Sequence, residues 1–196
     1  MEVKLEKYQP EKHDKELLAD LIFRSDEKMN TLTYGSNALD VIETLLDIPE
    51  SYFVPEYMDC AMVNDELVGV IVYFPVSKME EIDKIAGKGF MKAMGFLSFF
   101  KKMPLFMKMD KMLGGDLDDD GLYIHTLCVD EKFRGKGIGS DILEKIVEEN
   151  NKMYLYVNMD NKAALRFYKR NGFEEKHLGT MTHKGEKFGE YLMERK

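Results

Sequence analysis

Cysteine is scarce in this sequence, whose 196 residues include only Cys60 and Cys128. Both fall within apolar runs that predict β-strands. Two cysteines placed in this way favour neither a disulfide framework nor a zinc site. We therefore expect no metal site and a reducing compartment.

Long hydrophobic runs and an N-terminal leader are also missing. A membrane-spanning helix needs roughly 18 or more consecutive apolar residues, and no such run occurs. The opening stretch MEVKLEKYQPEKHDKE lacks the apolar centre of a signal peptide. We expect a cytoplasmic protein, and the sequence disfavours a membrane as a partner.

Positive charge is in deficit, since 28 Lys and Arg face 36 Asp and Glu and the formal net charge is −8. This balance argues against nucleic acid as a partner. It mildly favours cationic acceptors such as amines, although many cytoplasmic proteins are acidic without such a role. Hydrophobic residues make up 44% and charged residues 33% of the chain, which is typical of a soluble globular protein. The length suits a single domain over residues 1–196.

The clearest pattern in the sequence is a strand followed by a glycine-rich turn and a helix. Residues 122–130 form an apolar, partly β-branched run that predicts a buried strand. Ile138, Ile142 and Ile146 recur at helical spacing and predict the helix. The turn between them alternates glycine with other residues, at Gly135, Gly137 and Gly139. Its backbone N–H groups can point into one concavity, and the start of the helix favours a phosphate there.

The spacing of these glycines narrows the choice of nucleotide fold. The P-loop pattern GxxxxGK[ST] fails, and the dinucleotide pattern GxGxxG fails because Ser140 follows Gly139. The pattern that fits is Arg-x-x-Gly-x-Gly, formed by Arg134, Gly137 and Gly139. This motif resembles the acyl-CoA-binding signature of the GNAT superfamily of N-acetyltransferases.

A second block of sequence resembles the same family. Residues 153–159 predict a strand, and a helix is predicted to begin at Asn161 and to end at Gly172. The order and spacing of the two blocks match the family, and together they cover about a third of the chain. A glycine-rich turn that only packs a helix onto a sheet would explain one block, but not both in this order.

The rest of the chain agrees with the fold that the resemblance implies. A strand is predicted at residues 3–9, followed by helical stripes near residues 17–22 and 38–46. The polar stretch 29–35 between them is interpreted as a loop that lines an acceptor site or merely connects the helices. Two antiparallel hairpins are predicted, at residues 57–63 with 67–74 and at residues 175–183 with 188–194. The implied fold class is α/β (α+β), the GNAT fold: a mixed central sheet of about six to seven strands flanked by helices, with a helical insertion before the cofactor-binding strand.

Residues 76–120 depart most from a minimal member of this family. They hold 7 of the 15 Met and 5 of the 12 Phe. Three short helices are predicted, at residues 79–86, 90–100 and 105–113, with a break at residues 102–104. Four roles compete for this insertion: a cover over the acceptor side of the active site, a dimer interface, a basic patch on a membrane surface, and plain core packing. Neither a lipid anchor nor Trp supports the membrane role.

The resemblance implies acetyl-CoA as the cofactor and assigns residues to it. Its pantetheine arm would pair with the strand backbone at Leu127, Cys128 and Val129. Its pyrophosphate would lie on the residues of the turn, which are Arg134, Gly135, Lys136, Gly137, Ile138, Gly139 and Ser140. Asn161 would hydrogen-bond the pantetheine, or it only caps its helix.

The resemblance also implies the catalytic groups. Tyr168 stands where many members carry a tyrosine that contacts the cofactor and acts as general acid for the departing thiolate, and a core aromatic beside Phe167 is the alternative. Many members have a glutamate as base near the start of the cofactor strand, whereas this chain has His125 and Thr126 there. His125 is therefore the candidate base. A histidine that only hydrogen-bonds its neighbours, and a base elsewhere that acts through water, stay open.

These residues predict an N-acetyltransferase that moves an acetyl group from acetyl-CoA to a primary amine of a small molecule or peptide. The amine would attack directly within a ternary complex. The alternative is a non-catalytic acyl-CoA-binding domain that acts as a sensor or scaffold. The sequence leaves open which amine is the acceptor and whether the chain forms a homodimer.

Overall fold

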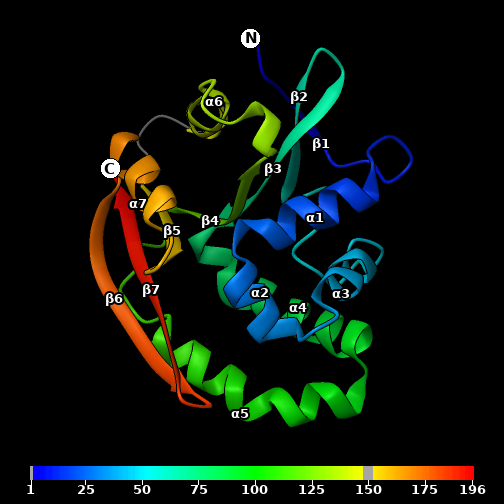
Figure 1. Cartoon of the computed structure of the whole chain (residues 1–196), viewed down its shortest axis with the longest axis vertical. Helices are drawn as coiled ribbons and strands as arrows, with labels where there is room; N and C mark the ends of the chain where they lie inside the picture. The colour runs from blue at the N-terminus through cyan, green and yellow to red at the C-terminus, as the bar shows by residue number, and fades with distance from the viewer. Residues whose placement is uncertain (1, 148–151) are drawn as a thin grey trace.

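The computed structural model describes residues 2–147 and 152–196. At its centre lies a mixed sheet with the strand order β1-β2-β3-β4-β5-β7-β6 (Figure 1). All neighbouring strands are antiparallel except β4 and β5, which are parallel. The strands are β1 Lys4–Lys7, β2 Met58–Val63, β3 Glu66–Pro75, β4 Leu122–Val129, β5 Met153–Asn158, β6 Glu174–His183 and β7 Glu186–Arg195. This seven-stranded sheet, with helices on both faces, confirms the predicted fold class.

The helices cover the sheet in two layers (Figure 1). They are α1 Lys15–Ser25, α2 Glu27–Tyr34, α3 Ala38–Leu45, α4 Met79–Met94, α5 Phe96–Met112, α6 Ile138–Ile146 and α7 Lys162–Arg170. One buried cluster joins α1, α3 and α4 to the sheet through Leu18, Ile42 and Ile82. A second cluster packs α6 and α7 on the other face through Ile142 and Leu165. The helical stripes in the sequence are explained by this burial, because each apolar face meets the sheet.

Most of the segment 29–35, which we predicted to be a loop, lies in helix α2. Asp26 caps this helix by accepting a hydrogen bond from the backbone N–H of Met29 at 3.0 Å. The side-chain amide of Asn30 donates to two carbonyl oxygens in the last turn of α1, both at 3.0 Å. Polar contacts hold the helix in place of a broad apolar stripe, and for this reason hydrophobic periodicity did not predict it.

The insertion at residues 76–120 contains two long helices, and not the three short ones that we predicted. The helical run is interrupted at Gly95, whose φ of 78° is left-handed, and not at residues 102–104. Pro104 lies inside α5. It removes only one backbone donor, so the helical turns on both sides remain intact.

Helix α5 runs below α2 in Figure 1 and reaches the β6–β7 hairpin. The ammonium of Lys102 donates to the carbonyl oxygen of Leu32 in α2 at 2.9 Å. At the C-terminal end of α5, the carbonyl oxygen of Met112 lies so close to Gly179 of β6 that a Cβ atom on residue 179 would be only 1.6 Å away from it. The helix therefore joins α2 to β6 and fixes their separation.

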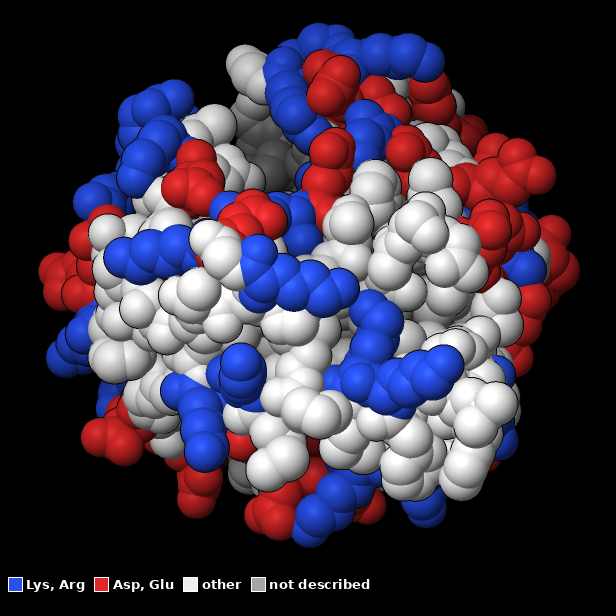
Figure 2. Space-filling model, turned by 60° about the horizontal axis from the view of Figure 1, so that its bottom comes forward, with Lys and Arg blue, Asp and Glu red and all other residues white. Residues whose placement is uncertain are grey.

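The outer face of α5 contrasts with the net charge of −8 of the whole chain. Four large apolar side chains of this helix are exposed: Phe96, Leu97, Phe100 and Met107. Figure 2, in which the bottom of Figure 1 comes forward, shows Lys and Arg side chains crossing a largely uncharged surface. Among the described residues, no helix combines the length and the apolar character needed to cross a membrane. The dimer and membrane-surface roles of the insertion stay predictions.

Candidate active site

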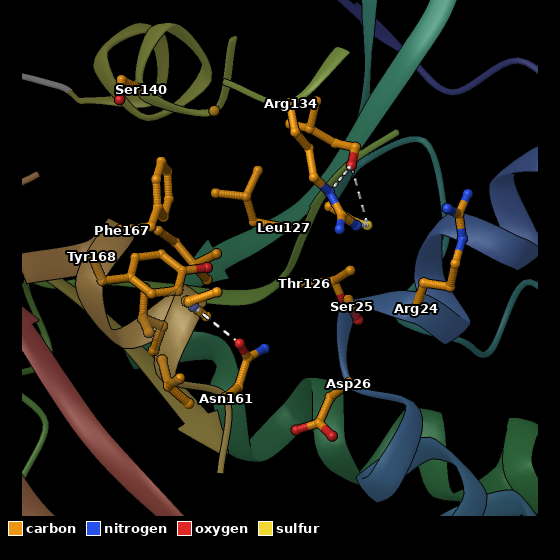
Figure 3. Close-up of a pocket in the computed structure, with 18 of the residues that line it drawn as sticks. Arg24, Ser25, Asp26, Thr126, Leu127, Arg134, Ser140, Asn161, Phe167 and Tyr168 are labelled. Atoms are coloured by element: carbon orange, nitrogen blue, oxygen red, sulfur yellow. Dashed lines mark hydrogen bonds between the residues drawn. The ribbon is translucent and has the colours of Figure 1, made fainter. Parts of the chain in front are cut away.

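The sheet opens between β4 and β5. Thr126 pairs with Val72 of β3 and Ile124 pairs with the next residue, Tyr73, so His125 is an extra residue that forms a bulge in β4. The two strands β4 and β5 pair only through the three residues before this bulge. Beyond it a cleft with a volume of about 580 Å³ is lined by both strands and by the starts of α6 and α7 (Figure 3).

The strand residues expected to hold the pantetheine arm all line this cleft: Leu127, Cys128 and Val129. Their backbone pairs with β3 on one side, and on the other side the described part of β5 offers no partner. A free strand edge of this kind can accept an extended ligand as an additional strand. The thiol of Cys128 is buried, and burial raises its pKa. It therefore stays protonated and is unsuited to nucleophilic attack.

The glycine-rich turn forms the end of the cleft where α6 begins. Gly135 and Gly137 have left-handed φ angles of 75° and 86°, and nothing would lie within 4 Å of a Cβ atom at either position. Among the described residues no side chain caps α6, so its first N–H groups lack a partner. Gly139 is glycine for another reason, because a Cβ atom there would lie 3.0 Å from the ring of Phe167. Open space and free backbone donors fit a pyrophosphate.

Three further residues predicted for the pyrophosphate line the cleft: Arg134, Ile138 and Ser140. Lys136 does not line it, because its ammonium lies over the ring of Phe133, 4.8 Å from the centroid. Arg134 folds back onto β4, where its Nε donates to a backbone carbonyl oxygen at 2.9 Å (Figure 3). The turn thus keeps one of its two predicted cations at the cleft.

Tyr168 extends from α7 and points its hydroxyl into the cleft (Figure 3). Its ring packs edge-to-face on Phe167 and Phe173, with centroid distances of 5.0 and 5.4 Å. Burial raises the pKa of its phenol above the usual value, so the hydroxyl stays protonated and can donate. Tyr168 is thus a core aromatic that also faces the cleft, and its role as general acid stays a prediction.

His125 lines the cleft, but burial lowers the pKa of its imidazole to about 4. Its ring stacks on Tyr52 with centroids 4.3 Å apart, and its Nδ1 lies 2.9 Å from Oγ1 of Thr126. A free histidine side chain titrates near neutral pH, but the apolar rings around His125 disfavour a charged imidazolium. The ring is neutral at physiological pH.

Asn161 caps α7, since its Oδ1 accepts a hydrogen bond from the backbone N–H of Ala164 at 3.0 Å. It also lines the cleft. The cap uses only the oxygen, so the amide nitrogen can still donate to a ligand. The capping role is confirmed, and the contact with pantetheine stays a prediction.

Several polar residues of the cleft were not predicted, among them Arg24, Ser25, Asp26 and Asn158. The first three lie where α1 ends and α2 begins, across the cleft from α7 (Figure 3). Asn158 is the last residue of β5. An Asp followed by a helix is a capping signal that the sequence does contain. Its place in the cleft depends on how α1 packs against β4, which the sequence does not display.

The sheet thus splits between the parallel strands β4 and β5, and the predicted strand, glycine-rich turn and helix form one side and one end of the gap. The model of the acetyltransferase (GNAT) family matches residues 18–173. The chain therefore belongs to the GNAT family of acetyltransferases.

Known proteins resemble this chain to different extents. An uncharacterized N-acetyltransferase of Methanocaldococcus jannaschii is 45% identical over 60 residues, which cover 28% of this chain and 26% of that protein. The crystal structure of an N-acetyltransferase from Staphylococcus aureus Mu50 has a TM-score of 0.65 at 19% identity, and the match covers 96% of this chain and 99% of that one. Arabidopsis thaliana Naa50, in complex with the bisubstrate analogue CoA-Ac-MVNAL, has a TM-score of 0.51 at 19% identity, with 99% and 98% covered. The two structures show a shared fold, and the match to the archaeal protein spans about a quarter of its length.

Proposed function

We propose that this protein is an acetyl-CoA-dependent N-acetyltransferase that acts on a primary amine of a small molecule or peptide. The observation that carries the proposal is the cleft between β4 and β5, in which a free strand edge, the uncapped start of α6 and the hydroxyl of Tyr168 meet. Membership of the GNAT family supports this reaction class. The complex of Naa50 with a CoA-linked peptide supports a peptide amine as one acceptor class.

The residues of the cleft fit coenzyme A along its length. The turn at Gly135 and Gly137 leaves space for the pyrophosphate beside the free N–H groups of α6. Arg134 and Arg170 line the same cleft and add positive charge. The free edge at residues 127–129 pairs with the pantetheine arm. When bound, acetyl-CoA supplies the activated acetyl group as a thioester.

The chain's own groups then favour direct attack. A backbone N–H of β4 beside the cleft can donate to the reacting carbonyl oxygen. The cleft holds both reactants in place, so the amine attacks within a ternary complex. Tyr168 gives its proton to the departing thiolate as general acid. Cys128 takes no covalent part, because burial keeps its thiol protonated.

His125 has a different role from the one expected of a base. With a pKa of about 4 it is too weak a base to take a proton from an ammonium group at neutral pH. We infer that it helps to position the acceptor. We also propose a cytoplasmic location, which the free thiols of Cys60 and Cys128 support, because a reducing compartment keeps thiols free.

Release of the coenzyme A thiol from acetyl-CoA by the purified protein tests the proposal. The panel of acceptors comprises polyamines, amino acids, aminoglycosides and N-terminal peptides, and we expect release with one class. With that amine, Tyr168→Phe should lower kcat by about a hundredfold, the usual contribution of a general acid. Its affinity for acetyl-CoA should change little.

Tyr34→Phe is the matched control for this substitution. Tyr34 is also a buried tyrosine whose pKa is raised by burial, and it lies outside the cleft. Its kcat should equal that of the wild type. An unchanged kcat in Tyr168→Phe would remove the role given to Tyr168. If the protein binds acetyl-CoA but none of the amines in the panel causes thiol release, it would be a binding domain and not a transferase.

A further inference from the structure

A buried acidic group lies at the opposite end of the cleft from the glycine turn. Asp26 and Asn158 line the cleft, and Glu190 of β7 is the pairing partner of Asn158. Partners on antiparallel strands project to the same face, so Glu190 lies beside Asn158. Figure 3 shows Asp26 at one end of the cleft and Ser140 at the other, with Tyr168 between them. The group is therefore placed where an acceptor would approach, away from the pyrophosphate.

These side chains are buried without being fully hydrogen-bonded. Asn158 is 5% exposed and Glu190 is 3% exposed. Within the described chain, Oε1 of Glu190 has no hydrogen-bond partner. The side chain of Asn158 acts on both carboxyl groups as a hydrogen-bond donor and lowers the pKa of each. The side-chain oxygen of Asn158, Oδ1, accepts a hydrogen bond from the backbone N–H of Asp160 at 3.0 Å. A buried carboxyl oxygen without a donor is unfavourable, which indicates that a ligand supplies the donor.

The surroundings of Glu190 disfavour its charged form. Burial, and then the charge of Asp26, raises the pKa of Glu190 to about 9. Asp160 acts in the same direction, whereas Asn158 and Lys28 oppose the rise. Glu190 therefore carries its proton at neutral pH until a positive charge arrives beside it.

The basic side chain of this region is already engaged elsewhere. Nζ of Lys28 lies 3.0 Å from the carboxylate of Asp160 and 3.3 Å from that of Glu186. It also lies over the ring of Phe188, 4.9 Å from the centroid. The nearby phenol of Tyr123 in β4 is buried, which raises its pKa and keeps it neutral. Lys28 therefore acts on Asp26 and Glu190 only through its longer-range charge, while its ammonium is bound to Asp160 and Glu186, and a ligand cation would add the missing direct contact.

We propose that Asp26 and Glu190, with Asn158 between them, bind the ammonium group of the acceptor and take up the proton that it must lose. This inference rests on the proposed function, since it completes the acceptor end of the same cleft. An ammonium group supplies the positive charge and the N–H donors that the carboxyls lack. Its arrival favours the ionised carboxylates, so binding releases the proton of Glu190 to solvent.

Each proton and each bond of the transfer step is accounted for by a named group. The bound ammonium gives one proton to the pair formed by Asp26 and Glu190, which titrates as a unit. The neutral amine forms the N–C bond to the acetyl carbon as the C–S bond breaks. Tyr168 protonates the sulfur, and the second N–H proton of the amine replaces the proton that Tyr168 gave. The products are the acetylated amine and the free thiol.

Calorimetry of n-butylammonium binding to the protein loaded with coenzyme A tests the site without turnover. Titrations at about pH 7.5 in two buffers of different ionisation enthalpy count the protons released. We expect n-butylammonium to bind at least about tenfold more tightly than the uncharged 1-butanol. We also expect release of up to about one proton, because Glu190 is protonated before the cation binds.

Two nearly isosteric variants and two matched controls locate the effect. Glu190→Gln should abolish the proton release, and Asp26→Asn should weaken binding of n-butylammonium about tenfold. Asp14→Asn is the control for Asp26→Asn, because Asp14 caps α1 as Asp26 caps α2. Glu194→Gln is the control for Glu190→Gln, because Glu194 is also a buried glutamate of β7 but is paired with Lys176. Both controls should bind and release protons as the wild type does.

Two results would overturn the site. The first is equal binding of n-butylammonium and 1-butanol, and the second is wild-type binding and proton release in both Asp26→Asn and Glu190→Gln. Failure of acetyl transfer to every amine, with cation binding and proton release intact, would instead refute the proposed function and leave the site in place.

Discussion

Replacing Glu190 by glutamine should stabilise the folded protein, and the gain should grow as the pH rises. Burial and the charge of Asp26 raise the pKa of Glu190 from the usual 4.5 to about 9. The folded chain therefore keeps this proton at neutral pH, whereas the unfolded chain releases it. A carboxyl group with a raised folded pKa destabilises the fold above its unfolded pKa, and the penalty increases until the folded group itself ionises.

The magnitude follows from the two pKa values. A difference of one pH unit corresponds to about 1.4 kcal/mol in the free energy of unfolding. Between the ordinary pKa of 4.5 and the folded pKa of about 9, the penalty reaches about 6 kcal/mol, and at pH 7 it is about 3 kcal/mol. Glutamine has nearly the same shape and no charge to bury, so it lacks this penalty. Below the ordinary pKa of glutamate, Glu190 is protonated in the folded and unfolded chains alike, so the wild type no longer carries this penalty relative to Glu190→Gln.

Urea unfolding followed by circular dichroism measures the effect, since the chain has no Trp to report by fluorescence. The difference in unfolding free energy between Glu190→Gln and the wild type should rise steadily from about pH 5 to about pH 9. Glu194→Gln should show no such gain, because the side chain of Lys176 lowers the pKa of Glu194. A difference that is independent of pH would refute the assignment of a neutral, buried Glu190.

Three further predictions concern glycines and a thiol. Gly137→Asp should weaken acetyl-CoA binding about a hundredfold or more in calorimetry, since it places a carboxylate at the proposed pyrophosphate site. The control is Gly185→Asp, because Gly185 also has a left-handed φ, of 84°, and lies in open space; this variant should bind acetyl-CoA normally. An equal loss of affinity in both variants would contradict a pyrophosphate site at Gly137. Gly179→Ala should lower the unfolding free energy by several kcal/mol, since its Cβ would lie 1.6 Å from the carbonyl oxygen of Met112, and a wild-type melting temperature would disprove the close contact. The thiol of Cys128 should resist an aromatic disulfide reagent until the protein unfolds, because burial raises its pKa; fast modification of the native protein would speak against this.

Local patterns in the sequence were sufficient to predict most of the sheet. Short polar residues with positive φ, Asn64 and Asp65, make the turn between β2 and β3, and they were recognisable beside two apolar runs. A bulge in β4 is implied by the resemblance to the GNAT family, but local patterns do not predict its position at His125. It depends on which residue of β3 each residue of β4 opposes, and that register is a long-range property.

The helices of the insertion were predicted less well, for physical reasons that the structure makes plain. α5 leaves Phe96, Leu97 and Phe100 exposed, so its apolar residues do not mark one buried face. Pro104 suggested the end of a helix, but tertiary contacts of Lys102, close to the proline, and of Met112, at the C-terminal end, hold α5 as one helix. No residue of the segment 76–120, all of which is described, lines the cleft. The insertion therefore does not line this cleft, and its predicted role as a cover over the acceptor stays a prediction.

The two ends of the cleft differ in how far the sequence could predict them. The proposed pyrophosphate end lies within one short stretch, residues 134–140, of which all but Lys136 line the cleft, so motif spacing could indicate it. The proposed acceptor end combines Asp26 and Asn158, which line the cleft, with Glu190, which pairs with Asn158 on the neighbouring strand. Their proximity depends on strand register and on the packing of α1 beside β4, and no spacing along the chain encodes either.

The acetyl group itself can be followed with isotope-labelled acetyl-CoA and the amine that the thiol-release panel identifies. In a rapid-quench experiment read by mass spectrometry, the label should appear on the amine and at no time on the protein, because the proposed attack is direct and the thiol of Cys128 stays protonated. Labelled protein that forms and decays before the product would contradict direct attack. Loss of the thioester without any labelled amine would contradict N-acetyl transfer in the cleft between β4 and β5.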